Sequence, residues 1–216
     1  MYIAHHMTIP PLSVTPDTLL PQVRELLLSR NFRHLPVVDE EGRLLGIITD
    51  RDIRSAYPSS LSSEEERRRI LEDIATTPVA RVMATELTTL SPTATLDDAL
   101  MVFERRRVGA IPVVDNDGLL VGIFSIRDLL QAYGTTFGLG EKGSCLVEIR
   151  DKEGPETLEL LIRVLGEHGI SFTRLVRSLK ERIIHVRVNT YNIRQMHKAL
   201  AAAGLEVVTV PGRSGQ

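Results

Sequence analysis

The stretch Leu35-Pro36-Val37-Val38-Asp39 returns 76 positions later as Ile111-Pro112-Val113-Val114-Asp115. The same offset aligns Gly46-Ile47-Ile48-Thr49-Asp50-Arg51-Asp52 with Gly122-Ile123-Phe124-Ser125-Ile126-Arg127-Asp128, and no gap is needed. Two copies of one supersecondary unit therefore occupy the first part of the chain. A unit with one apolar face usually buries that face against its sibling, so we expect one body with pseudo-two-fold symmetry.

Composition narrows the class of protein. The chain has 216 residues, a net charge of −2, 43% hydrophobic and 25% charged residues, which is typical of a globular protein with one or two cores. The near-zero charge argues against nucleic acid as a partner, and no apolar run approaches the ~18 residues of a membrane span. The N-terminus does not look like a secretory signal, and a lone cysteine, Cys145, favours a reducing, cytoplasmic location.

The residue pattern predicts five segments. Residues 1–57 and 79–133 each contain a helix, a strand, a turn, a second strand and the start of another helix. Residues 58–78 predict a solvated connecting helix, capped by Ser62 and carrying i,i+4 pairs Glu64–Arg68 and Glu65–Arg69. Residues 134–143 contain four glycines and predict a linker. The GxGxxG sequence within this segment follows a helix and precedes a strand, so we interpret it as part of the linker and not as a dinucleotide-binding motif. Residues 144–212 predict a βαββαβ order, the ferredoxin-like arrangement, so the fold class is α/β (α+β).

A hydroxyl and a carboxylate stand three residues apart at both predicted strand-to-helix junctions. These pairs are Thr49 with Asp52, and Ser125 with Asp128. A carboxylate can accept both vicinal hydroxyls of a ribose, and a hydroxyl beside it can meet a phosphate. The alternative is that each pair only caps the helix that follows, as Thr95 and Asp98 are expected to do.

The repeated segments resemble a pair of CBS domains, regulatory modules of the cystathionine-β-synthase type, over residues 7–133. The resemblance implies binding of an adenosine nucleotide (AMP, ADP or ATP) in clefts between the repeats. It places Thr49, Asp52, Ser125 and Asp128 on ribose and phosphate, beside Pro36 and Pro112, with Arg33 and His34 near the phosphate. Gly109 and Ala110 replace the two cations in the second copy, so the two clefts should differ. Arg105, Arg106 and Arg107 either compensate or only favour a helix end.

The C-terminal segment resembles an ACT domain, mainly through its element order. The resemblance places a ligand turn at Asp151, Glu153 and Gly154. The order Glu153-Gly154-Pro155 departs from the Pro-Gly order that is usual in ACT domains, and a bulky Glu156 follows. An equally good interpretation is therefore that this turn binds no ligand and only orients the helix, and that the sheet serves dimerisation.

A CBS pair followed by an ACT-like domain is similar to the acetoin-utilisation regulatory proteins of bacteria. The resemblance implies a cytoplasmic homodimer that senses a nucleotide and controls a protein partner, without being an enzyme. No metal-ligand spacing and no catalytic motif is found in the sequence, so neither a metal nor a cofactor is expected. The alternatives are a structural adaptor with empty clefts and an enzyme without a recognisable motif.

Overall fold

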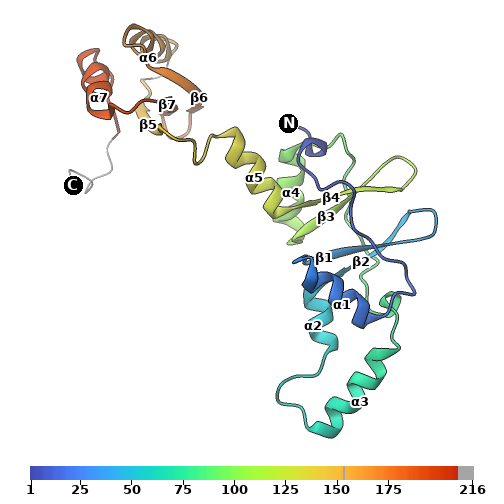
Figure 1. Ribbon diagram of the computed structural model, residues 1–216. Coiled ribbons are helices and arrows are strands. Elements are labelled where there is room, and N and C mark those ends of the chain that lie inside the picture. The colour runs from blue at the N-terminus through green and yellow to red at the C-terminus, as the bar shows by residue number, and fades with distance from the viewer. Residues whose placement is uncertain (153, 209–216) are drawn as a thin grey trace. The chain divides into compact units, whose positions relative to one another are not determined.

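The computed structural model describes residues 1–152 and 154–208, and the chain divides into two compact units (Figure 1). The first unit ends at Ala132 and the second begins at Tyr133. Among the described residues, none of the helices is long and apolar enough to cross a membrane.

The first unit contains two antiparallel hairpins with matching registers. Its strands are β1 (His34–Val38), β2 (Leu44–Thr49), β3 (Ala110–Val114) and β4 (Leu120–Ser125). β1 pairs with β2 and β3 with β4, and both ladders shift register at the same place, after Val37 and after Val113. Its helices are α1 (Leu20–Ser29), α2 (Asp50–Ala56), α3 (Glu64–Ala75), α4 (Leu96–Arg106) and most of α5 (Ile126–Thr136). The predicted internal repeat is therefore a structural repeat.

The tips of the two hairpins are joined by reciprocal hydrogen bonds. The Leu44 N–H donates to the Gly118 carbonyl at 3.2 Å, and the Leu120 N–H donates to the Gly42 carbonyl at 3.0 Å. Both glycines have positive φ, +84° at Gly42 and +80° at Gly118, a backbone conformation that side chains disfavour. This pair of bonds has the pseudo-two-fold symmetry that the sequence predicts.

The segment that precedes each copy packs on the other copy. At the N-terminus, the Ile3 N–H donates to the Ala94 carbonyl at 2.9 Å, and Thr8 forms a bridge with Ile123 of β4. The 3-10 helix here spans Ile3–His5, and Ile3 is completely buried.

The equivalent segment of the second copy packs on the first. The Val79 N–H donates to the Thr18 carbonyl at 2.8 Å, and Ala84 forms a bridge with Ile47 of β2. Val79 also belongs to the core cluster of the first copy. Each repeat is therefore completed by a segment that precedes the other repeat in the sequence.

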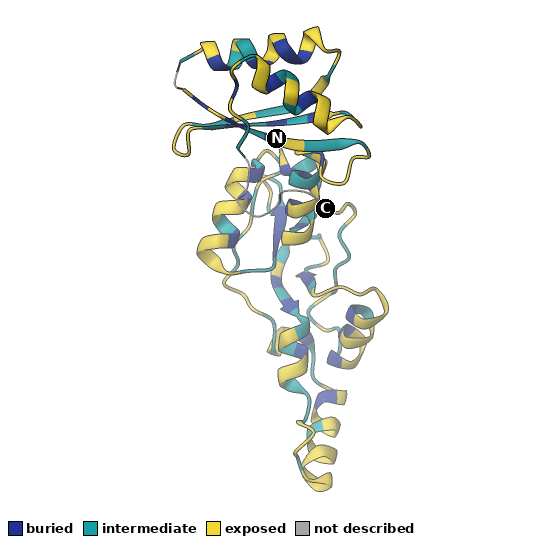
Figure 2. Ribbon diagram, turned by 90° about the vertical axis from the view of Figure 1, so that its left-hand side faces the viewer, coloured by how far each residue is buried: buried dark blue, intermediate teal, exposed yellow. Residues whose placement is uncertain are grey.

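Helix α3 extends away from the hairpins of this unit, and most of its residues are exposed (Figure 2). Only its second half packs on the core, through Ile74, which is buried, and Ile70, which is partly buried. Residues 58–78 contain this helix, and its cap is Ser63, whose side chain accepts from the Glu66 N–H, and not the expected Ser62. The predicted ion pairs along the helix do not form: within the described chain, Glu64, Glu65, Arg68 and Arg69 make no salt bridge.

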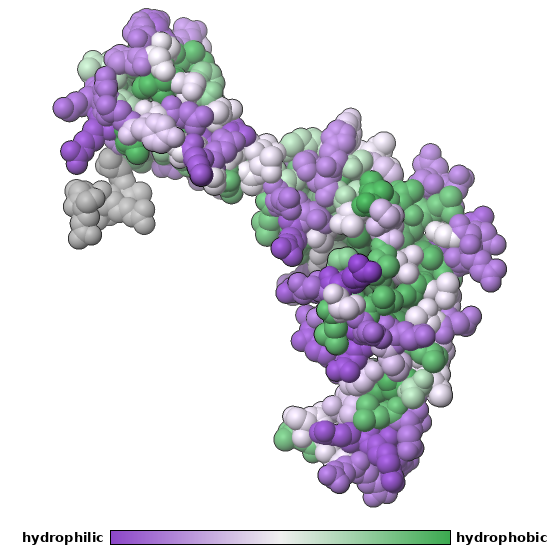
Figure 3. All heavy atoms as spheres, viewed as in Figure 1, coloured by the Kyte–Doolittle hydropathy of each residue, from purple (hydrophilic) through white to green (hydrophobic). Residues whose placement is uncertain are grey.

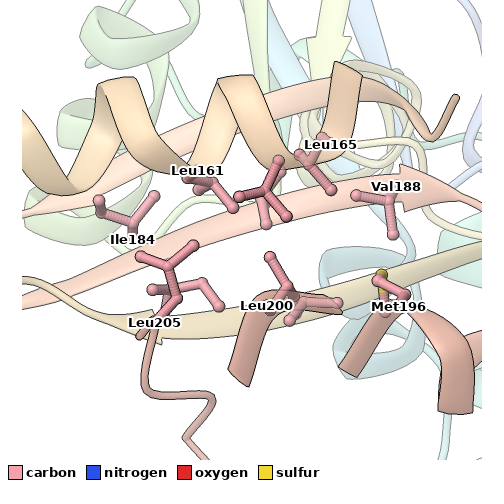
Figure 4. Packing of buried hydrophobic residues seen from close by; sticks show 11 residues of the cluster. Leu161, Leu165, Ile184, Val188, Met196, Leu200 and Leu205 are labelled. Carbon is pink, nitrogen blue, oxygen red and sulfur yellow. The ribbon is translucent and has the colours of Figure 1, made fainter. Parts of the chain in front are cut away.

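The second unit is a three-stranded antiparallel sheet, in the order β5-β7-β6, covered by two helices (Figure 4). Its elements are β5 (Ser144–Arg150), α6 (Glu156–Glu167), β6 (Ser171–Ser178), β7 (Ile183–Asn189) and α7 (Ile193–Ala202). Leu161 and Leu165 of α6 and Leu200 of α7 are almost fully buried against Ile184 of β7, so both helices cover one face.

The last predicted strand is reduced to a single bridge. Val207 pairs with Ile149 of β5, and the Val208 N–H donates to the Glu148 carbonyl at 2.8 Å. Residues 209–212, the end of the predicted domain, lie outside the described residues. The predicted linker is also shorter than expected, because α5 continues through Gly134 to Thr136.

The helical end of α5 is held by Arg174 of β6, within the second unit. Its guanidinium donates to the Thr136 carbonyl at 2.6 Å and to the Thr135 carbonyl at 3.0 Å. The same group forms an ion pair with Glu141 at 2.7 Å. A cation at the last carbonyls satisfies groups that a helix end leaves unpaired, which explains why the helix passes Gly134.

Candidate functional site

The first candidate site is the junction between β2 and α2. Thr49 is the last residue of β2 and the N-cap of α2. Its N–H and its hydroxyl both donate to Oδ2 of Asp52, at 2.8 and 2.7 Å, and the Asp52 N–H donates back to Oγ1 of Thr49 at 3.2 Å. The pair is half-buried. The local sequence therefore closes a capping box around one oxygen of the carboxylate.

The junction between β4 and α5 has the same geometry. The Ser125 N–H and hydroxyl donate to Oδ2 of Asp128 at 2.8 and 2.7 Å, and the Asp128 N–H donates to Oγ of Ser125 at 3.3 Å. In both junctions, no residue that the structure describes donates to the second oxygen, Oδ1. Each carboxylate therefore has one oxygen that accepts from the N–H and hydroxyl of the capping residue, Thr49 or Ser125, and one that is available to a ligand.

Both pairs therefore do cap the helices that follow them. A third capping box, at the start of α4, provides a comparison. Thr95 and Asp98 repeat the arrangement at α4, with 2.8 and 2.7 Å to Oδ2. Asp98 is exposed, whereas Asp52 and Asp128 are half-buried. The hydrogen bonds from Thr95 lower the pKa of the Asp98 carboxyl. The Thr95–Asp98 box does not follow a strand, so it serves as the capping-only comparison for the boxes at Asp52 and Asp128.

The cations predicted for the phosphate lie beside the first junction. His34 pairs directly with Thr49 across the β1–β2 ladder, and the Arg33 carbonyl accepts from the Asp50 N–H at 3.0 Å. Burial lowers the pKa of the His34 imidazole; Asp50 opposes this shift, Arg33 adds to it, and Asp52 opposes it. His34 is therefore less readily protonated than an exposed histidine.

The second junction has no equivalent of Arg33 and His34, but one of its neighbouring residues contacts His34. Ala110 pairs with Ser125 where His34 pairs with Thr49. Gly109, which aligns with Arg33, lies against the His34 imidazole: a Cβ on Gly109 would lie 2.7 Å from Cε1. The residues around the two junctions therefore differ, and the His34 imidazole contacts the segment that leads to the second junction. In the sequence, the feature that points to this contact is Gly109, a glycine at the position that aligns with Arg33.

Two other sets of predicted residues have structural partners of their own. Pro36 and Pro112 are buried in their strands, and their carbonyls accept from the N–H groups of Val14 and Leu90 at 3.0 and 3.1 Å. Arg105 and Arg106 form the last turn of α4, where cations favour the helix end, and Arg107 closes the helix in the left-handed conformation. The structure therefore gives each set a local role in the fold.

The predicted turn of the second unit is closed by a residue that the sequence analysis missed. Arg177 of β6 forms an ion pair with the buried carboxylate of Asp151 and donates to the Gly154 carbonyl at 2.6 Å. The Glu156 side chain fills the space beside Gly154, which has a φ of +116°. Glu153 lies outside the described residues. No local spacing could have indicated Arg177, which stands 26 positions after Asp151.

The comparison with known families decides the identity of the first unit. The CBS domain model matches residues 3–59 and 79–135, which together are more than half of the chain. The chain belongs to the CBS-domain family. It is 27% identical over 222 residues to inosine-5′-monophosphate dehydrogenase of Aquifex aeolicus, which covers 94% of this CBS protein but only 42% of the relative. The chain thus spans less than half the length of that enzyme.

Solved CBS structures resemble the first unit. A putative acetoin utilization protein (AcuB) from Vibrio cholerae is 26% identical, with a TM-score of 0.55, over 66% of this chain and 96% of that one. CBSX2 in complex with AMP (24% identity, TM-score 0.53) covers 62% of this chain and 96% of that one. A CBS domain pair with 5′-methylthioadenosine and S-adenosyl-L-methionine (23%, 0.52) covers 62% and 97%. At these identities the last two show the shared fold.

Within the described residues, no group of three or more histidine, cysteine, aspartate or glutamate side chains could hold a metal ion. The candidate sites are the two strand-to-helix junctions, with Arg33 and His34 beside the first.

Proposed function

We propose that this CBS protein is a non-catalytic regulator that binds an adenosine nucleotide at its strand-to-helix junctions and relays binding to the C-terminal unit. The observation that carries the proposal is that the same carboxylate geometry occurs at two half-buried strand-to-helix junctions, whereas the Asp98 box is exposed. Asp52 and Asp128 each hold Oδ2 with two hydrogen bonds and present Oδ1 without a partner in the described chain. A preoriented carboxylate oxygen suits the hydroxyls of a ribose, because both are donors.

The first junction is the stronger site in this proposal. At the first junction, Arg33 supplies a cation for a phosphate and the His34 imidazole supplies a second polar group, whereas the aligned Gly109 and Ala110 supply neither. A nucleotide that carries phosphate should therefore prefer the first junction, whereas an uncharged adenosine compound should discriminate less. The bound compounds of the CBS neighbours, AMP in one and 5′-methylthioadenosine with S-adenosyl-L-methionine in another, support adenosine as the common element.

Helix α5 is the proposed route of the relay. It begins next to Ser125, and its end is bound by Arg174 of β6. A ligand that orders the Ser125–Asp128 junction acts on the first turn of this helix. Coupling between sites in proteins is commonly about 1–3 kcal/mol and is reciprocal, so it is measurable.

The C-terminal unit is proposed as an ACT-like, ferredoxin-type domain that transmits and does not bind an amino acid. Val207 beside β5 adds a fourth position to the order β5-β7-β6, which agrees with the βαββαβ plan. Arg177 binds the turn at Asp151 and Gly154, and Glu156 fills the space beside Gly154. A role in acetoin or energy metabolism rests on the resemblance to AcuB.

Isothermal titration calorimetry with AMP, ADP, ATP and S-adenosyl-L-methionine tests the binding. We expect Asp52→Asn to weaken nucleotide binding about tenfold or more, since hydrogen bonds to charged groups contribute about 1.5–3 kcal/mol. Asp98→Asn is the matched control, because it alters the same capping box where no ligand is proposed. Absence of binding by every ligand, or equal losses in Asp52→Asn and Asp98→Asn, would reject the sensor and favour an adaptor with empty sites.

A further inference from the structure

Helix α3 carries an exposed block of six charges in which three acids are followed by three bases. Glu64, Glu65 and Glu66 form the first turn, and Arg67, Arg68 and Arg69 follow directly. All six side chains are exposed. None of them forms a salt bridge with any residue that the structure describes.

The order of these charges is inverted about the middle of the block. If a second helix of the same sequence lies antiparallel, with a two-fold axis between Glu66 and Arg67, the acidic half of one copy lies along the basic half of the other. A parallel arrangement in register places like charges together. A contact of this kind is isologous, so it closes as a dimer.

An exposed leucine lies near each end of the block. Leu61, in the turn before the helix, is 93% exposed, and Leu71 is 42% exposed. In the antiparallel arrangement, Leu71 of one helix lies near the turn that holds Leu61 of the other, and this contact occurs twice. Glu64, Arg67, Arg68, Leu71, Glu72 and Ala75 line a shallow, open surface along α3. Apolar burial at both ends adds to charge pairs that contribute little singly when exposed.

The first half of α3 is free to make such a contact. Only Ile70 and Ile74, in the second half, pack on the core of the first copy. The helix therefore projects from its unit (Figure 1), and its surface is mostly hydrophilic with small apolar patches (Figure 3).

We propose that α3 is a self-association surface: it pairs antiparallel with α3 of a second copy of this chain, glutamates against arginines. The contact is independent of nucleotide binding. It is strongest at low ionic strength, because salt screens exposed charges. A dimer formed through α3 would contain four candidate ligand sites, two from each copy.

Charge reversal gives a test with a built-in control. Variant A carries Glu64→Arg, Glu65→Arg and Glu66→Arg, and variant B carries Arg67→Glu, Arg68→Glu and Arg69→Glu. Each variant presents six like charges, so self-association through α3 should weaken at least tenfold in sedimentation velocity at 50 mM salt. An equimolar mixture of A and B should associate at least as tightly as the wild type.

The mixture also separates the proposal from a simple loss of structure. Variant A places cations at the start of the helix and can fray it, whereas variant B keeps the acidic first turn, so circular dichroism is compared for both. Wild-type association by B alone, or no association between A and B with α3 helical, would overturn the proposal.

A cross-link locates the contact if another face also dimerises. Glu66→Cys is made in a Cys145→Ser background, and a short bis-maleimide should join two copies at this position in low salt but not in 1 M salt. Glu104→Cys on the exposed side of α4 is the control. Cross-linking at position 104 and not at 66 would overturn the α3 contact.

Discussion

The His34 imidazole occupies the space in which Gly109 would carry a side chain. A Cβ on Gly109 would lie 2.7 Å from Cε1 and 2.9 Å from Nε2 of His34. The two residues come from different repeats, and Gly109 is the position that aligns with Arg33. The first junction thus has Arg33 and His34 while the second has neither, and the absence of a side chain at Gly109 is what makes room for the imidazole.

Gly109→Ala tests this relationship. The added methyl must displace the imidazole, and we expect a loss of about 1 kcal/mol of unfolding free energy, the low end for overpacking because a histidine ring can rotate. Nucleotide affinity at the first junction should fall as well. Urea denaturation and calorimetry measure the two effects.

Gly134→Ala is the matched control. Gly134 lies inside α5 with no atom within 4 Å of an added Cβ, so alanine should be neutral or stabilise by up to about 1 kcal/mol. If Gly109→Ala behaves as this control does, the contact has no energetic consequence.

The lowered pKa of His34 predicts a pH dependence of stability. The folded-state pKa lies below the ordinary value of 6.5, so on acidification the unfolded chain takes up the proton first. Stability that is present above pH 6.5 is therefore lost as the pH falls from 6.5 to the folded pKa. Urea denaturation at pH 7.5, 6.5 and 5.5 should show a larger loss in the wild type than in His34→Gln. Equal losses in both proteins contradict this assignment.

Removing Arg177 should destabilise the second unit. The Asp151 side chain is 1% exposed and that of Arg177 is 28% exposed, so Arg177→Met removes the guanidinium of Arg177 from a buried carboxylate. We expect a cost of about 3 kcal/mol, the lower end for breaking a buried pair because Arg177 is partly exposed. The double variant Asp151→Asn with Arg177→Met should recover part of it. A double variant as unstable as Arg177→Met would show that the charge is not the cause.

Removing Arg174 should release the end of α5. Arg174→Met leaves the carbonyls of Thr135 and Thr136 without their cation, and hydrogen exchange over residues 133–141 should accelerate. Arg163→Met, on the exposed side of α6, is the control and should leave this segment unchanged.

The same measurement tests the relay. In the wild type, saturating nucleotide should change protection in residues 144–208, and Arg174→Met should reduce that change. Unchanged protection there in the wild type, despite binding, would make α5 a tether and not a route for coupling.

The sequence by itself determined the repeat, and with it the fold of the first unit. An ungapped offset that preserves strand, turn, strand and capping residues specifies local structure twice, because hydrophobic period and turn chemistry act over a few residues. The same local chemistry made the boxes at Thr49–Asp52 and Ser125–Asp128 predictable, and it placed Gly42 and Gly118 at the hairpin tips.

Only the tertiary structure decided which residues meet across long separations. The segments at Ile3 and Val79 pack on the opposite repeat, Arg177 reaches Asp151, and Arg174 extends α5 past a glycine that predicted a linker. The missing salt bridges of α3 belong here too, since exposed pairs gain little and open readily. Each of these contacts depends on packing between distant segments, whose free energy is not encoded in any short stretch of sequence.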